Sequence, residues 1–130
     1  MHRNPARPLS PHLTHYRWGP HMLVSILHRL TGDGAAIVGG ALLVWWLAAA
    51  AGGPEAYASF VQVATLPWLL IIWIPLSWGI IQHTLSGLRH LVMDIGAGYE
   101  LRANKAMAVA TLIVSLLLTA LLWVYILGVI

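Results

Sequence analysis

Three long apolar runs organise the chain, and its polar residues gather between them. Ala35–Ala51, Phe60–Gln82 and Ala106–Ile130 each contain no charged residue. A helix needs about 20 mostly apolar residues to cross a hydrocarbon core of about 30 Å. With their helical flanks, the three runs predict transmembrane helices over about 23–51, 60–93 and 106–129.

Glycines and prolines punctuate these helices. Gly52, Gly53 and Pro54 end the first, because glycine and proline together are strong helix stops. Pro75 lies inside the second, where a membrane helix tolerates a kink because neighbouring groups satisfy the freed carbonyl. We therefore expect an all-α integral membrane fold, a single domain over 1–130 with an N-terminal segment, 1–22, outside the first helix.

The composition agrees with this pattern. Hydrophobic residues make up 59% of the chain and charged residues only 8%, where about 25% is usual in a soluble domain. This excludes a soluble globular protein, and the same apolar content excludes a disordered one. The chain has no cysteine, so it cannot form a disulfide, a thiolate zinc site or an iron–sulfur cluster by itself.

The basic residues predict the orientation. Four of the seven lie in the N-terminal part up to Arg29 and three lie between Arg89 and Lys105, whereas the first connection, Gly52–Ser59, has none. Because Lys and Arg are enriched in cytoplasmic loops, we expect the N-terminus on the cytoplasmic or matrix side and the C-terminus opposite. These flanking charges also explain the net charge of +3 without a nucleic-acid partner. The lead before Ala35 is too long and polar for a cleaved signal peptide.

Ser25, His28 and Arg29 form a polar cluster at the cytoplasmic end of the first helix. On insertion scales, the free-energy cost of an ionisable side chain at membrane depth is about 2.5–3.5 kcal/mol. The presence of such side chains here therefore needs a structural or functional explanation. One interpretation is structural: His28 and Arg29 reach the headgroups, and Ser25 bonds to its own helix. The other is a binding site, because a quinone carbonyl that gains electrons needs hydroxyl and guanidinium donors such as Ser25 and Arg29.

A second cluster contains His83, Gly87, His90 and Asp94. Offsets of four, seven and eleven residues place all four within roughly 40° of one line along a helix. A single histidine at this depth is most often a satisfied core residue, neutral and hydrogen bonded. Gly87 favours a ligand role for His83, because a missing Cβ leaves room for a flat macrocycle such as haem against the helix.

Together the two clusters indicate electron transfer to a quinone beside a haem. Haem propionates carry two negative charges, and His28, Arg29 and His90 are suitable cationic neighbours for them. Because Arg29 would serve both sites, we expect the sites to be neighbours. His12 and His15 have a spacing that could hold a metal, but without a third ligand an interfacial loop is the better interpretation.

Small residues at four-residue spacing predict close helix packing, either within this chain or against a second membrane subunit. The two stripes are Gly32, Ala36 and Gly40, and Thr111, Ser115 and Thr119.

Four segments resemble one known family. They are Arg7–Leu13 (RPLSPHL), Tyr16–Trp18, Ser25–Gly32 (SILHRLTG) and His83–Asp94 (HTLSGLRHLVMD). Their order and their positions at the helix ends resemble the cytochrome b556 membrane-anchor subunits of succinate dehydrogenase (complex II, succinate:quinone oxidoreductase). With the three-helix plan, the resemblance covers nearly the whole chain.

The resemblance implies a role for each motif residue. In that family the histidine at the position of His83 is one axial ligand of the haem b iron, and the other comes from the sibling anchor subunit. Ser25 and Arg29 correspond to residues of the ubiquinone pocket, which the sibling anchor and the iron–sulfur subunit complete. His28, Arg29 and His90 match residues near the haem propionates. The chain would then be half of a haem-containing helical bundle.

The resemblance also implies the place of this chain in a larger assembly. Its partners would be a second membrane-anchor subunit, an iron–sulfur subunit, a flavoprotein subunit and the lipid bilayer of a bacterial inner or mitochondrial inner membrane. Electrons would pass from the iron–sulfur subunit to ubiquinone, the last part of succinate oxidation in the tricarboxylic acid cycle. The chain would not oxidise succinate on its own, and none of its residues is assigned a catalytic role.

Three other functions remain open from the residues. The chain could be a haem-free structural anchor, or the anchor of a fumarate reductase that uses menaquinone. A small transporter or channel with a proton path along the His–Asp face is the third. That function requires ionisable residues through the full membrane depth, and the outer halves of the helices have only Glu55 in their connection.

Overall fold

The computed structural model describes residues 6, 8, 12 and 14–129. Arg3, Arg7 and most of the motif at 7–13 lie outside the described residues. All elements in the described part are helical. In chain order they are α1 (Pro20–Gly34), the π-helical turn η1 (Ala35–Gly39), α2 (Gly40–Ala51), α3 (Pro54–Ala64), the 3-10 turn η2 (Pro67–Leu69), α4 (Leu70–Asp94) and α5 (Leu101–Val129).

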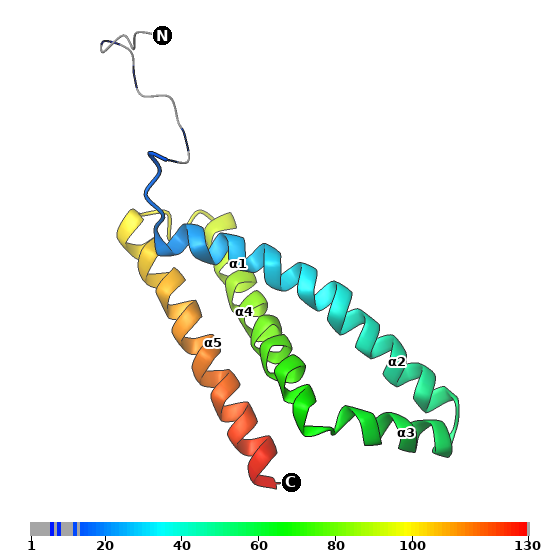
Figure 1. Ribbon diagram of the computed structural model, residues 1–130. Helices are drawn as coiled ribbons and strands as arrows, with labels where there is room; N and C mark the ends of the chain where they lie inside the picture. The colour runs from blue at the N-terminus through cyan, green and yellow to red at the C-terminus, as the bar shows by residue number, and fades with distance from the viewer. Residues whose placement is uncertain (1–5, 7, 9–11, 13, 130) are drawn as a thin grey trace.

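Three helical spans are long and apolar enough to cross a membrane: Pro20–Ala51, Pro67–Asp94 and Leu101–Gly128. This confirms the predicted all-α fold with three transmembrane helices. The side of the membrane on which each end lies stays a prediction. In Figure 1 α5 packs along α4, α1 and α2 form one long helix at an angle to them, and α3 lies at the end opposite the start of α1.

The first span is one long helix with a wide turn inside it. Pro20 occupies the first helical position, where its missing N–H has no helical partner in any case. The π-helical turn η1 joins α1 to α2 without a break in helical backbone angles. The helix ends at Gly52, and Gly53 has a φ of +92°, a left-handed conformation that favours glycine. The predicted first connection, 52–59, is therefore shorter in the structure, because α3 begins at Pro54.

The second predicted helix, 60–93, is divided in the structure. Leu66 is extended, with φ −61° and ψ 130°, because the ring of Pro67 disfavours the helical conformation of the preceding residue. The chain therefore turns a corner between α3 and α4. The indole N–H of Trp73 donates a hydrogen bond of 2.9 Å to the carbonyl of Ala64 and ties α4 to the end of α3. Pro75 lies inside α4, which continues through it.

The third span begins earlier than the uncharged run that predicted it. The structure starts α5 at Leu101, so Arg102 and Lys105 lie in its first turns. Both side chains are exposed, and an exposed helix end accommodates charge. The charged residues thus mark the edge of the apolar run, and the helix itself extends beyond it.

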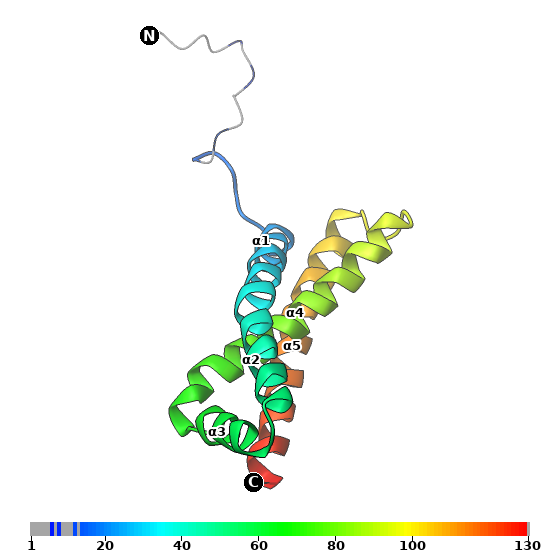
Figure 2. The ribbon, with the colours of Figure 1, turned by 90° about the vertical axis from the view of Figure 1, so that its right-hand side faces the viewer.

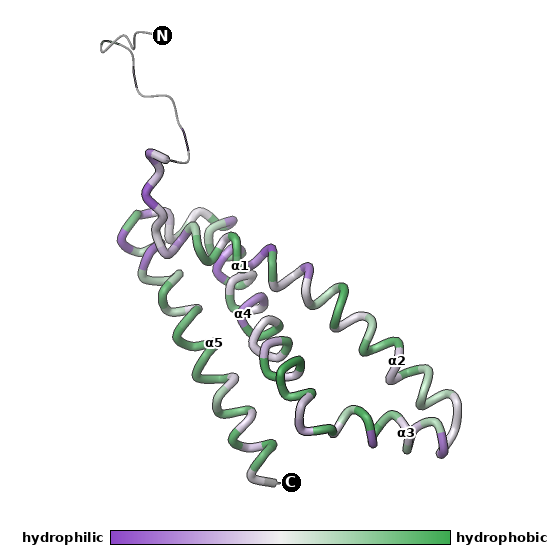
Figure 3. Tube along the Cα trace, viewed as in Figure 1, coloured by the Kyte–Doolittle hydropathy of each residue, from purple (hydrophilic) through white to green (hydrophobic). Residues whose placement is uncertain are grey.

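The bundle is tightest where α1 begins. There α1 packs against α4 and α5, and Val24 and Ala108 are fully buried. Further along, α2 packs against α3, and α1 and α2 together run at an angle to α4 (Figures 1 and 2). Figure 3 shows the polar residues gathered around the tight end and apolar residues over most of α2, α4 and α5. The tight end is where the predicted site residues lie.

Candidate functional site: three imidazoles between two spans

The crossing of α1 and α4 brings the two predicted polar clusters into contact. The rings of His28 and His83 stack, with centroids 3.9 Å apart and planes only 8° from parallel. The ring of His90 lies 5.1 Å from that of His28, tilted by 58°. We call His28, His83 and His90 the imidazole cluster. It combines one residue from the first polar cluster with two from the second.

Hydrogen bonds from α1 orient the ring of His83. Its Nδ1 lies 2.9 Å from the carbonyl oxygen of His28, and 3.4 Å from the hydroxyl oxygen of Thr31. A carbonyl oxygen only accepts hydrogen bonds, so the proton of this bond belongs to Nδ1. In the neutral ring Nε2 then has a free lone pair, which is the form that binds a metal.

Gly32 allows this close approach. A Cβ atom at Gly32 would lie 2.7 Å from Cε1 and 3.1 Å from Nδ1 of His83, too close for either atom to stay in place. The small-residue stripe predicted close packing here. The structure gives the reason at this position: the backbone of α1 lies directly against the edge of the His83 ring.

The same geometry leaves room for a group on the remaining edge of His83. His28 stacks on the face of the ring, and Nδ1 and Cε1 face α1, so Nε2 is on the edge that these contacts leave uncovered. Beside Gly87, a Cβ would meet Cε1 of His28 at 3.6 Å, an ordinary contact, so the bare patch predicted for a macrocycle faces the ring of His28 in this chain. The Nδ1 atom of His28 is buried and has no hydrogen-bond partner among the described residues. These features fit a haem bound through His83 with a polar group near His28.

Ser25 and Arg29 lie one turn apart on α1, and both side chains are exposed. Asp94, at the end of α4, is exposed as well. The structure therefore does not join Ser25 and Arg29 to other described groups in a closed pocket. Any pocket over them needs residues from elsewhere.

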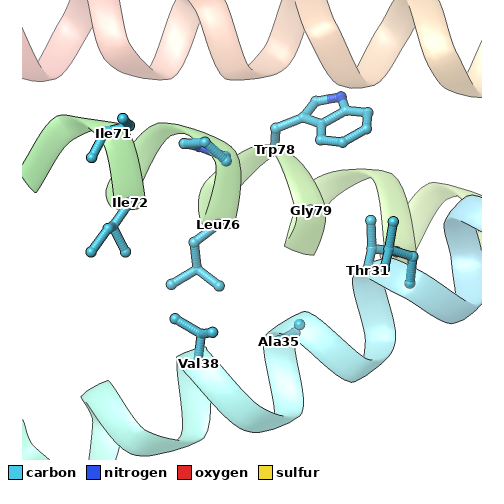
Figure 4. A pocket seen from close by; sticks show the side chains of 11 residues that line it. Thr31, Ala35, Val38, Ile71, Ile72, Leu76, Trp78 and Gly79 are labelled. Carbon is cyan, nitrogen blue, oxygen red and sulfur yellow. The ribbon is translucent and has the colours of Figure 1, made fainter.

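A separate apolar pocket of about 420 Å³ lies between α1–η1 and α4 (Figure 4). Thr31 lies at its edge, and neither Ser25 nor Arg29 lines it. The sequence did not predict this pocket. It is lined by Leu30, Thr31, Gly34, Ala35, Val38, Ile71, Ile72, Pro75, Leu76, Trp78 and Gly79.

Sequence reasoning also missed a second polar face of α4. Gln82, Ser86 and Arg89 are buried in α4, and the guanidinium of Arg89 donates to the side-chain oxygen of Asn104 in α5. Arg89, one of the basic residues that predict the orientation, lies within α4 and is only 6% exposed. The offsets of four and seven residues from Gln82 were the available signal.

The described residues contain no group of three His, Cys, Asp or Glu side chains that could hold a free metal ion. The rings of His12 and His15 are 6.1 Å apart, and both residues are exposed. The imidazole cluster thus offers one well-oriented histidine with two others beside it. This arrangement suits a cofactor that brings its own iron and takes one ligand from this chain.

Comparison with known proteins agrees with this geometry. Residues 3–122 match the family described as succinate dehydrogenase/fumarate reductase transmembrane subunit. The chain is 37% identical over 118 residues to the succinate dehydrogenase cytochrome b556 subunit of Rickettsia typhi, covering 91% of both chains. It is also 37% identical over 114 residues to the mitochondrial succinate dehydrogenase cytochrome b560 subunit of Mus musculus. That match covers 85% of this chain and 66% of the mouse protein.

The family match spans both polar clusters, the first two spans and most of the third. The matches agree with the family that the sequence motifs resemble. The chain belongs to the succinate dehydrogenase/fumarate reductase transmembrane subunit family.

Proposed function

We propose that this chain is a membrane-anchor subunit of succinate dehydrogenase that supplies one axial haem ligand and part of the quinone-reduction site. The observation that carries the proposal is the orientation of His83: Nδ1 is hydrogen bonded to the carbonyl of His28, which leaves Nε2 free to bind iron. The relatives are named cytochrome b subunits, which supports haem b as the group that is bound.

Haem b, when bound, supplies a one-electron carrier within the membrane. His83 would hold the iron through its free Nε2, and the sibling anchor subunit would supply another histidine. His28 and His90 lie beside His83 and, with Arg29, hold the propionate groups through charge-assisted hydrogen bonds. The unpartnered Nδ1 of His28 supports this role, because a buried polar atom needs a partner.

Ser25 and Arg29 bind the quinone. A quinone carbonyl gains negative charge and protons as it is reduced, so a hydroxyl and a guanidinium are suitable donors to it. Their exposure on α1 supports a site shared with other subunits, because this chain does not enclose them. We take ubiquinone as the substrate, since the similar proteins are succinate dehydrogenase subunits of a mitochondrion and a bacterium.

The soluble partners are an iron–sulfur subunit, which passes electrons to the quinone, and a flavoprotein subunit, which oxidises succinate. The absence of cysteine supports this division, because the chain cannot ligate a cluster by itself. We place these partners on the side of the membrane where α1 begins and the basic residues gather.

Replacement of His83 tests the proposal. In a complex purified through a tag on this chain, His83→Ala should abolish the native low-spin haem spectrum, because the iron loses one axial ligand. His15→Ala, at an exposed histidine outside the three spans, is the matched control and should leave the spectrum unchanged. A native spectrum in the His83→Ala complex would reject the ligand role and favour an anchor whose haem is ligated by another residue, whereas no haem spectrum in the unsubstituted complex would favour a haem-free anchor.

A second measurement separates succinate dehydrogenase from a fumarate reductase anchor. The quinone extracted with the purified complex, and the rates of succinate oxidation and fumarate reduction, identify the direction of catalysis. We expect ubiquinone and faster succinate oxidation. Menaquinone together with faster fumarate reduction would instead identify the chain as a fumarate reductase anchor.

A further inference from the structure

We infer that one turn of α1, from His28 to Gly32, positions the His83 ring for iron, with Thr31 as a positioning residue whose hydroxyl and methyl groups both act. The inference rests on the proposed ligand role of His83. It assigns to Thr31 and Gly32 a function that neither the sequence motifs nor the family membership gave them.

The hydroxyl of Thr31 has a fixed direction. It donates a hydrogen bond of 2.7 Å to the carbonyl of Leu27, and it lies 3.1 Å from the carbonyl of His28. Threonine hydroxyls in helices commonly bond back to the preceding turn in this way. Because the proton is used in these bonds, the lone pairs of the oxygen are what Nδ1 of His83 meets at 3.4 Å.

The methyl group of Thr31 fixes the same side chain from the other side. A Cβ at Gly79 would lie 3.7 Å from the Thr31 Cγ2 atom, an ordinary contact, so this methyl faces α4 at Gly79. Thr31 is 8% exposed. A β-branched residue has few χ1 states, and here the methyl contact and the hydroxyl bonds select the same one.

The ring of His83 is thus contacted on one face and at two neighbouring ring atoms, Nδ1 and Cε1. His28 stacks on its face, the carbonyl of His28 and the hydroxyl of Thr31 accept from Nδ1, and the backbone of Gly32 lies against Cε1. Each of these contacts comes from a single turn of α1. Metal-binding histidines usually need such a partner on the second nitrogen, because it fixes the tautomer and raises the basicity of the ligating nitrogen.

Two variants of this turn test different contacts. Thr31→Val keeps the shape of the side chain and removes its hydroxyl. Nδ1 of His83 then loses one of its two hydrogen-bond acceptors, and the ligating nitrogen becomes less basic. We expect the haem midpoint potential to rise and haem affinity to fall by about tenfold, the lower end of the range for such partners. Thr31→Ser restores the hydroxyl and should restore both values. Gly32→Ala leaves the hydroxyl but pushes the ring away, and should alter the haem spectrum.

Thr84→Val is the matched control. Thr84 is the neighbour of His83 on α4, is exposed, and makes the same kind of bond to its own helix, 2.8 Å to the carbonyl of Ile80. Like Thr31→Val, the Thr84→Val substitution removes a threonine hydroxyl, but this hydroxyl makes no contact with His83. All variants are measured in the intact complex, by haem retention during detergent washing, by redox titration and by the low-temperature spectrum.

The outcomes separate this inference from the proposed function. If His83→Ala removes the native spectrum while Thr31→Val and Gly32→Ala both match Thr84→Val, His83 is a ligand but this turn does not position it. If His83→Ala leaves the spectrum native, the proposed function itself fails. Should Thr31→Val prevent assembly, Gly32→Ala decides: a native spectrum and potential in that variant would overturn the inference.

Discussion

Helix α4 carries two polar faces, and they differ in access. The face toward α1 presents His83 and His90, which meet His28 of α1 in the partly exposed imidazole cluster, beside the exposed Ser25 and Arg29 of α1. The face toward α5 presents Gln82 and Arg89, with exposures of 0% and 6%. A ligand from outside the chain can reach the first face and cannot reach the second. Polarity at membrane depth therefore does not by itself identify a site.

The two faces also differ in how they use hydrogen bonds. On the α5 face, bonds join helix to helix: the indole N–H of Trp78 donates to Ser115 at 3.0 Å, and that of Trp123 donates to Ser77 at 2.8 Å. On the α1 face, bonds orient one ring and leave its far nitrogen free. We interpret the α5 face as structural and the α1 face as a binding site.

The largest effect should appear when this chain is separated from its partners. The α4–α5 contact lies within the chain, whereas the α1 face supplies only one of the two proposed axial ligands. Expressed alone in a membrane or micelle, the chain should therefore fail to retain stoichiometric low-spin haem. Optical spectra of the isolated chain and of the intact complex make the comparison. Stable bis-histidine haem in the isolated chain would mean that the site is complete within one subunit.

The next effect concerns the exposed part of the α1 face. Arg29→Ala should reduce quinone reduction by about a hundredfold, the scale for loss of one donor to a developing negative charge. Electron transfer from succinate to a soluble dye should persist, because that route does not use the quinone site. Arg102→Ala is the control, since Arg102 is also exposed at the basic end of a span. Equal loss of both activities in Arg29→Ala would assign Arg29 to assembly instead.

The sequence predicted the fold and named candidate site residues, but it did not reveal the contacts between them. Apolar runs predict membrane spans because the bilayer imposes their length, and the spacing of His83 and His90 on one helix follows from helix geometry. The stacking of His28 on His83 depends on how α1 crosses α4, which no local pattern encodes. The contact between Thr31 and His83 depends on the same crossing, so the sequence did not reveal the role of Thr31 either.

The corner before α4 and the burial of Arg89 show two further limits. A proline such as Pro67 can stand either at the start of a helix or at a kink within one. The second run is divided into α3 and α4 because Leu66 is extended, which the sequence pattern alone did not decide. Arg89 was grouped with the basic residues that predict topology, but it faces α5 and donates to Asn104. Charge alone did not reveal on which face of α4 it lies.

A smaller effect should come from the hydrogen bond between Trp78 and Ser115. Interhelical hydrogen bonds in membrane proteins average about 0.6 kcal/mol in double-mutant cycles. We expect the cycle of Trp78→Phe and Ser115→Ala, measured by unfolding in mixed micelles, to give a coupling free energy of about that size. The haem spectrum of each variant should stay native, since neither residue belongs to the imidazole cluster. A changed spectrum would show that the α5 face is coupled to the site.

The smallest effect should come from Gln82→Leu. The side-chain amide of Gln82 is fully buried, and neither its nitrogen nor its oxygen has a hydrogen-bond partner among the described residues. Removal of a buried polar group that has no partner costs little, because the folded state loses a desolvation penalty of about 1–3 kcal/mol. Leucine has a similar size, so the thermal midpoint of the complex should stay the same or rise.

Gln82 is adjacent in sequence to His83 but faces α5, so this substitution compares the two faces at one depth of the membrane. Haem retention and quinone reduction in Gln82→Leu should match the unsubstituted complex, whereas His83→Ala loses the native haem signal. A marked fall in the thermal midpoint would mean that ordered water or a partner group satisfies the Gln82 amide. Loss of haem would mean that the α5 face also contributes to the site, and the division of α4 into a binding face and a structural face would be wrong.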